Sequence, residues 1–187
     1  MKHIFTIVFA VLATGIAANA QEWSFGPKVG MTFSTVNGVQ TAEVREGVVA
    51  GVFAERAIGD MVSMQADLLF SQHGYDLKTD PKTRYRVDYL SLPIVSKYYL
   101  FDNFNFQLGG QFEYLLGAKE KVSGQSSRSI RNDFNRYNIS FIAGLAYDFD
   151  FGLVVEGRYF YGLTQLTPLA DNSRSGYLQL SLGYRFW

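Results

Sequence analysis

The final stretch of the chain, Gly176 to Trp187, constrains the fold more than any other. Apolar side chains occupy every second position in it: Leu178, Leu180, Leu182, Tyr184 and Phe186. Small or polar residues lie between them: Gln179, Ser181, Gly183 and Arg185. This alternation with period two predicts a β-strand with one apolar face. Because the chain ends on Phe-Trp, the pattern is typical of the closing strand of a bacterial outer-membrane β-barrel, whose apolar face meets lipid.

The same terminus carries a candidate assembly signal. Gly183, Tyr184, Phe186 and Trp187 resemble the signal by which the barrel-assembly machinery recognises its substrates. We therefore expect that machinery to be a partner of this chain during its biogenesis.

The N-terminus has the three-part pattern of a secretory signal peptide. Lys2 and His3 precede an almost wholly apolar run, Ile4 to Ala18, and Ala18-Asn19-Ala20 gives a small-x-small cleavage site. A run of about 15 apolar residues is shorter than the roughly 20 that a membrane-spanning helix needs. We therefore expect residues 1–20 to be a cleaved signal peptide and residues 21–187 to form one outer-membrane β-barrel domain.

Composition supports strands and argues against several partners. The 17 basic and 17 acidic residues balance, so nothing indicates a nucleic-acid partner. Aromatic residues make up 16% of the chain and there are 18 glycines, a mixture that suits twisted strands better than helices. The chain has no cysteine, so neither a lipid anchor on a new N-terminal cysteine nor a disulfide is expected.

Eight alternating segments predict an all-β fold, an eight-stranded antiparallel up-and-down transmembrane β-barrel. About 9–11 residues suffice for a tilted strand to cross the hydrocarbon layer. We expect the strands at residues 25–33, 47–56, 62–72, 87–99, 104–116, 136–149, 151–161 and 176–187. Pro93 lacks a donor for the ladder, so we expect a bulge or distortion there.

The connections between these segments alternate in length. Three are short, at residues 57–61, 101–103 and 148–150, and four are long, at residues 34–46, 73–86, 117–135 and 162–175. This asymmetry is typical of outer-membrane barrels and predicts periplasmic termini and extracellular long loops. Aromatic residues near the short connections predict an interfacial belt: Trp23, Phe25, Tyr98, Tyr99, Phe101, Phe104, Phe149, Phe151, Phe186 and Trp187.

The polar faces of the strands predict a network of charges in the lumen. Four acids and four bases share the inward side: Lys28, Glu55, Asp67, Lys97, Glu113, Glu156, Arg158 and Arg185. A barrel of eight strands has a lumen just wide enough to be filled by its own side chains. Because buried charges must be paired, we expect a plug of salt bridges and hydrogen bonds. A narrow ion path is the alternative.

A catalytic site has little support in the sequence. His73 is the one histidine of the expected mature chain, and Ser71 lies on the same strand face. A serine and a histidine can form a nucleophile–base pair, but residues i and i+2 of a strand stand about 7 Å apart. We therefore predict no enzyme, no catalytic residues, no cofactor and no metal site. The loop from Lys119 to Arg136 is rich in basic residues, which suit either contact with lipopolysaccharide phosphates or a solvated loop.

Several motifs resemble one known family, the PorT-like outer-membrane barrel proteins common in Bacteroidota. The matching segments are Gly26-Pro-Lys-Val-Gly30, Gly51-Val-Phe-Ala-Glu55, Leu68-Leu-Phe-Ser-Gln-His-Gly74, Tyr89-Leu-Ser-Leu-Pro-Ile94, Lys97-Tyr-Tyr99 and Gly183-Tyr-Arg-Phe186. His73 stands where such sequences often carry a lysine. The resemblance implies an outer-membrane barrel and, because the founding protein is associated with type IX protein secretion, possible secretion-system partners.

Four functions therefore compete. The first is a non-enzymatic envelope barrel with a filled lumen that supports structure or binds a partner, with outer-membrane lipid and lipopolysaccharide around it. The others are an accessory component of type IX secretion, a lipid-modifying enzyme and a soluble ligand-carrying barrel of the lipocalin kind. A soluble carrier needs apolar residues inside and charged ones outside, which is the reverse of the pattern expected here.

Heat-modifiable migration on a detergent gel distinguishes the membrane barrel from the soluble one. We expect the unboiled protein to run faster than the boiled protein, because a closed membrane barrel stays folded in detergent. Solubility of the protein without detergent would contradict the membrane interpretation.

Overall fold

The computed structural model describes residues 23–36, 42–43, 45–77, 83–122, 128–129, 135–164 and 175–186. The expected signal peptide and Trp187 lie outside these residues. The eight long strands are β1 (Trp23–Val36), β3 (Arg45–Ala57), β4 (Val62–Leu77), β5 (Thr83–Tyr99), β6 (Phe104–Val122), β8 (Tyr137–Asp148), β9 (Leu153–Gly162) and β10 (Ser175–Tyr184). Two short strands accompany them, β2 (Ala42–Glu43) and β7 (Arg128–Ser129). No helix of the described residues is long and apolar enough to cross a membrane.

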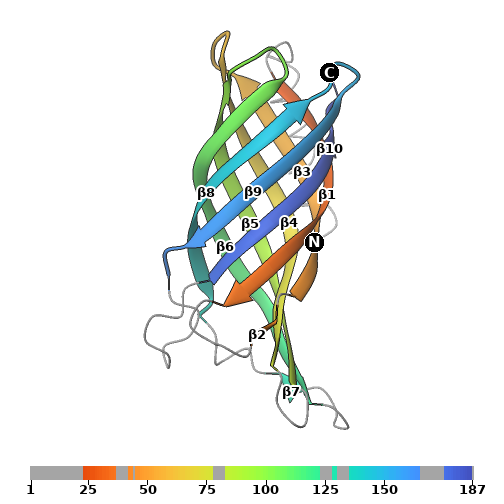
Figure 1. Cartoon of the computed structure of the whole chain (residues 1–187), viewed down its shortest axis with the longest axis vertical. Helices are drawn as coiled ribbons and strands as arrows, with labels where there is room; N and C mark the ends of the chain where they lie inside the picture. Colours follow the sequence, from red (N-terminus) through yellow and green to blue (C-terminus); the bar gives the residue numbers. More distant parts are fainter. Residues whose placement is uncertain are drawn as a thin grey trace, which may run out of the picture.

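The long strands form a closed antiparallel ring. Each pairs with the next long strand along the chain, and the ring closes because β1 pairs with β10, with Lys28 opposite Gly183. The eight-stranded up-and-down barrel expected from the sequence is therefore confirmed. Figure 1 shows the short turns at the end of the barrel that also carries the C-terminus, with β2 and β7 at the other end.

Burial along the strands is the reverse of that in a soluble protein. Outward apolar side chains are exposed, for example Val52 at 55% and Leu180 at 48%, whereas the inward Lys97 and Arg158 are 0% exposed. Charged side chains are almost never fully buried in soluble proteins unless they are paired. The outer wall is thus an apolar surface suited to lipid, and the polar side chains fill the lumen.

The strands extend further at the long-loop end than the sequence analysis expected. Strand β4 continues to Leu77, β5 starts at Thr83 and β6 continues to Val122. Hydrogen-bonded pairing continues beyond the apolar belt, where the alternation of apolar and polar residues that marks a strand has faded. The expected loop at residues 73–86 is therefore mostly strand, and His73 lies within β4.

Pro93 interrupts a ladder without shifting its register. The pairing of β4 with β5 skips from Ala66 opposite Ile94 to Leu69 opposite Ser91, as expected beside a proline that has no N–H. The register shift lies elsewhere, between Asp88 and Tyr89, where β6 contributes one extra residue. The expected distortion at Pro93 is thus a gap in one ladder, and the bulge lies toward the long-loop end.

Gly26 allows close approach at the seam that closes the barrel. A Cβ placed on it would overlap the backbone carbonyl oxygen of Tyr184. We expect Gly26→Ala to force the seam apart and to lower the fraction of protein that migrates as a folded barrel on unboiled gels. Gly59→Ala is the matched control, because nothing lies within 4 Å of a Cβ there. Equal folding of the two variants would contradict this view of the seam.

Candidate functional site

The centre of the lumen holds an ion network that spans the barrel. Asp67 on β4 accepts hydrogen bonds from Lys28 Nζ at 2.9 Å, from Gln65 Nε2 at 2.6 Å and from Arg158 Nη1. Strands β4 and β9 are four places apart in the ring, so Arg158 and Asp67 reach each other from opposite walls. Their pairing fills the cross-section of the lumen.

Glu156 completes this central network. Its carboxylate lies 2.6 Å from Lys28 Nζ and 2.7 Å from Arg158 Nη2. The Nε group of Arg158 donates to Gln107 Oε1 at 2.6 Å. Two acids therefore face two bases, all of them nearly inaccessible to solvent, which is the pairing that buried ions require.

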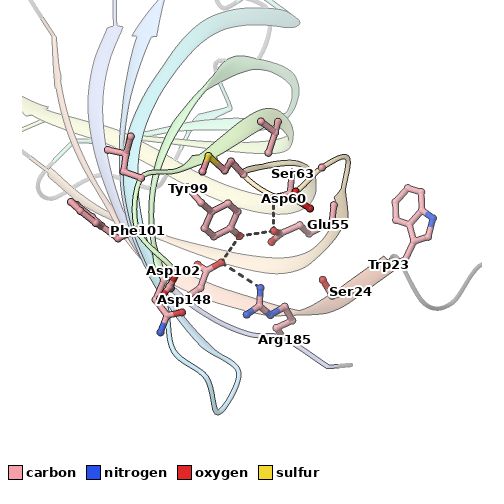
Figure 2. A pocket seen from close by; sticks show the side chains of 16 residues that line it. Trp23, Ser24, Glu55, Asp60, Ser63, Tyr99, Phe101, Asp102, Asp148 and Arg185 are labelled. Carbon is pink, nitrogen blue, oxygen red and sulfur yellow. Dashed lines mark hydrogen bonds and ion pairs between the residues drawn. The ribbon is translucent and has the colours of Figure 1, made fainter.

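A second ion cluster lies toward the short-turn end (Figure 2). Lys97 Nζ donates to both Glu55 and Asp148 at 2.9 Å. The Tyr99 hydroxyl lies between the same carboxylates, 2.9 Å from Glu55 Oε1 and 2.8 Å from Asp148 Oδ2. Arg185 Nη1 also lies 3.4 Å from Asp148 Oδ2. This cluster joins β3, β5 and β8 through one ammonium group.

An apolar cluster lies beside the ions on the long-loop side. Val95, Ile142, Phe160 and Tyr177 come from β5, β8, β9 and β10 and are at most 4% exposed. The rings of Phe160 and Tyr177 stack, with centroids 4.4 Å apart and planes 6° from parallel. Since Phe160 follows Arg158 by two residues on the inward face of β9, this cluster covers the ion network directly. Water and ions therefore meet an apolar barrier as well as paired charges.

Glu113 belongs to a separate polar group nearer the long-loop end. Its Oε1 lies 3.3 Å from His73 Nε2 and accepts hydrogen bonds from Ser91 at 3.2 Å and from the Tyr177 hydroxyl at 3.4 Å. The His73 ring also packs on Tyr177, with centroids 4.4 Å apart. His73 thus contacts a carboxylate and an aromatic ring in the lumen.

The structure brings together most of the charged residues predicted from the sequence. Seven of the eight lie in the two ion clusters, and Glu113 lies apart from them with His73. Sequence reasoning missed Asp148, although it lies on the inward side of its strand, because it sits at the strand end. It also assigned Tyr99 to the aromatic belt, which is wrong. Tyr99 follows the inward Lys97 by two residues, so it lies on the same face of β5, and its hydroxyl contacts Glu55 at the edge of the lumen.

The lumen opens at the short-turn end into a basin of about 810 Å³. Its lining includes Glu55, Ser63, Tyr99, Asp148 and Arg185, so the two carboxylates that Lys97 binds are part of its wall (Figure 2). Among the described residues no group of three or more His, Asp or Glu side chains is arranged to hold a metal ion. The basin therefore reaches the carboxylates of the second ion cluster.

A closed barrel with a lipid-facing wall and a paired polar lumen is the architecture of outer-membrane proteins, and sequence comparison agrees. The family described as "Outer membrane protein beta-barrel domain" matches residues 19–167. The chain belongs to this family. Its members reside in the outer membrane, and so does this barrel. No curated protein matches the chain in sequence.

Solved structures of other outer-membrane barrels share the fold. Ail, the attachment invasion locus protein of Yersinia pestis, in complex with the heparin analogue sucrose octasulfate, superposes with a TM-score of 0.54 at 18% identity, covering 88% of this chain and 99% of Ail. Neisserial surface protein A gives a TM-score of 0.57 at 13% identity, covering 88% of this chain and 97% of its own. At such identities the likeness extends to the fold alone.

Removing the Lys97 ammonium should destabilise the barrel. Lys97→Met leaves the Glu55 and Asp148 carboxylates buried beside each other without their shared cation. We expect the free energy of unfolding to fall by about 3–5 kcal/mol, the typical cost of breaking a buried ion pair. Urea-induced unfolding in phospholipid vesicles measures this change.

Ser96→Met is the matched control, since Ser96 is the neighbouring residue on the outward face. The methionine there contacts lipid, so we expect little change in stability. A double variant that also replaces Glu55 with Gln should recover part of the loss caused by Lys97→Met. Equal stability of the Lys97 and Ser96 variants would show that the cluster contributes nothing to the fold.

Proposed function

We propose that the protein is a non-conducting, non-enzymatic outer-membrane barrel that acts as a structural or partner-binding element of the envelope. The observation that carries this proposal is the filled lumen. Lys97, Ile142, Arg158 and Phe160 come from three strands, β5, β8 and β9, and are each 0% exposed. A solute cannot cross the barrel without breaking paired charges and separating the apolar cluster, and both steps carry a large free-energy cost.

The absence of catalysis is supported by what surrounds His73. A nucleophile needs a base within hydrogen-bonding reach, and the base in turn needs an orienting group. His73 has a carboxylate partner in Glu113, but the serine that contacts Glu113, Ser91, donates its hydroxyl to the same oxygen. With the Tyr177 hydroxyl, three groups contact one oxygen of Glu113, an arrangement that holds this carboxylate in place.

We propose that the termini lie in the periplasm and that the long-loop end faces outward. Here β4, β5 and β6 continue past the barrel, and β2 and β7 add to this sheet by pairing with β4 and β6. Figure 1 shows this extension beyond the barrel wall. Sheet edges and loops held by a rigid barrel are suited to binding a partner.

The register of this extension favours an anionic partner. Arg84 is paired with Lys121, and Arg86 with Lys119. Basic residues at paired positions offer an anionic partner several cations at one level, although Asp76 of β4 is opposite Arg84 on its other side. The phosphates of lipopolysaccharide are the polyanion nearest to this level of the membrane, and Ail, with the same fold, was solved with a sulfated sugar. Lipopolysaccharide binding that weakens with added salt would support this partner.

The resemblance to PorT-like proteins of Bacteroidota supplies a second candidate, an accessory role in type IX protein secretion. The segment Tyr89 to Ile94 and the ending Gly183 to Phe186 are among the motifs that carry this resemblance, and the secretion role is what the resemblance implies. Loss of exported cargo proteins after deletion of the gene would support this role, and unchanged export would exclude it.

Conductance in planar lipid bilayers tests the filled lumen directly. We expect purified protein to insert without reproducible openings, because no path of water crosses the ion and apolar layers. A general porin inserted under the same conditions is the positive control. Reproducible openings of porin size from the pure protein would overturn the proposal of a non-conducting barrel.

A further inference from the structure

The lipid-facing wall carries a hollow over β3 and β4. Two adjoining depressions of about 600 Å³ and 670 Å³ share Ala54 and Ala66 as their common floor. These two alanines are direct cross-strand partners. Because the neighbouring outward residues Phe25, Val52, Leu68 and Ile94 are larger, the two small side chains leave a groove between them.

The walls of the groove beside the two alanines are apolar. Phe25 is the partner of Ala54 on one side and Ile94 is the partner of Ala66 on the other. Leu68 and Leu92 border the part of the groove farther from the short turns, where the ladder between β4 and β5 is interrupted beside Pro93. The shape and chemistry of this groove fit a flexible hydrocarbon chain.

A cationic residue marks the short-turn end of the groove. Arg56 is exposed and lines the depression of about 600 Å³. Its guanidinium lies 5.7 Å from the centroid of the Trp23 ring. Tryptophan rings favour the level of lipid headgroups, and arginine side chains reach toward that level from apolar surfaces. An anionic group at this height would therefore meet a guanidinium suited to phosphate.

We propose that this groove is a binding site for one phospholipid, with an acyl chain over Ala54 and Ala66 and the phosphate on Arg56. The two features fit one molecule because the charge lies at the end of the groove nearest the membrane surface and the apolar part runs from it into the hydrocarbon layer. In the proposed orientation the short-turn end faces the periplasm, where the outer-membrane leaflet consists of phospholipid. The groove would thus bind one phospholipid selectively, whereas the rest of the outer wall is surrounded by lipid without selection.

Native mass spectrometry of the purified barrel in mild detergent, with added phosphatidylethanolamine or phosphatidylglycerol, tests the site. We expect one lipid to remain bound to the unmodified protein. Arg56→Gln should weaken retention about tenfold, as expected for loss of one charged hydrogen bond. Ala54→Leu combined with Ala66→Leu should weaken it severalfold by filling the groove, because packing contacts drive association within a membrane.

The matched controls change the same residue types elsewhere on the surface. Ala143→Leu alters an outward alanine of β8, and Arg136→Gln removes an exposed arginine near the long-loop end. Both controls should retain the lipid as the unmodified protein does, and heat-modifiable migration should show that every variant is folded. Loss of lipid only from the groove variants supports the proposal.

Three results would overturn it. Equal retention by all the variants would mean that the bound lipid is unselective solvation of the wall. Retention of added lipopolysaccharide in place of phospholipid would assign the groove to the other leaflet. A dimer that the paired leucine substitutions dissociate would make this face a contact between two copies of the chain.

Discussion

The fold depends on the pairing of ionised side chains that have neither bulk water nor lipid headgroups around them. Asp67, Glu156, Lys28 and Arg158 are at most 2% exposed, yet each lies within 3 Å of an opposite charge. An isolated ion in such a place would cost several kcal/mol. The lipid outside the barrel demands an apolar outer face, so the polar residues can only turn inward, and once inside they can only be tolerated in pairs.

Most of the fold follows from alternation in the sequence. With one face of each strand in lipid and the other in a polar lumen, a period of two is imposed on almost every spanning residue, and strand identity, strand number and inward or outward direction could all be read from it. Seven of the eight predicted lumen charges lie in the ion clusters. Phe160 and Ile142 were harder to foresee, because an apolar residue on the inward face of a strand gives no contrast with its neighbours.

What the sequence could not supply is the set of partners across the lumen. Which base meets which acid depends on strand tilt and on the closing register, neither of which is encoded in one strand. His73 illustrates the limit: the sequence placed it at the end of a strand, and its contact with Glu113 arises only because β4 continues past it and β4 and β6 face each other across β5. The strand ends at the long-loop side were missed for a related reason, since polar strands outside the lipid carry no alternation.

The ion pairs also bear on how such a barrel can be assembled. Apart from the contact between Glu156 and Arg158 within β9, none of the salt bridges described joins a strand to its immediate neighbour in the ring: Lys28 reaches from β1 to β4 and β9, and Lys97 from β5 to β3 and β8. A single hairpin entering the bilayer would therefore bring its charges without their counterions. Insertion one hairpin at a time is therefore disfavoured for this chain. The lumen favours an intermediate in which the strands are already paired as a curved sheet and the polar face stays in contact with water until β1 and β10 pair.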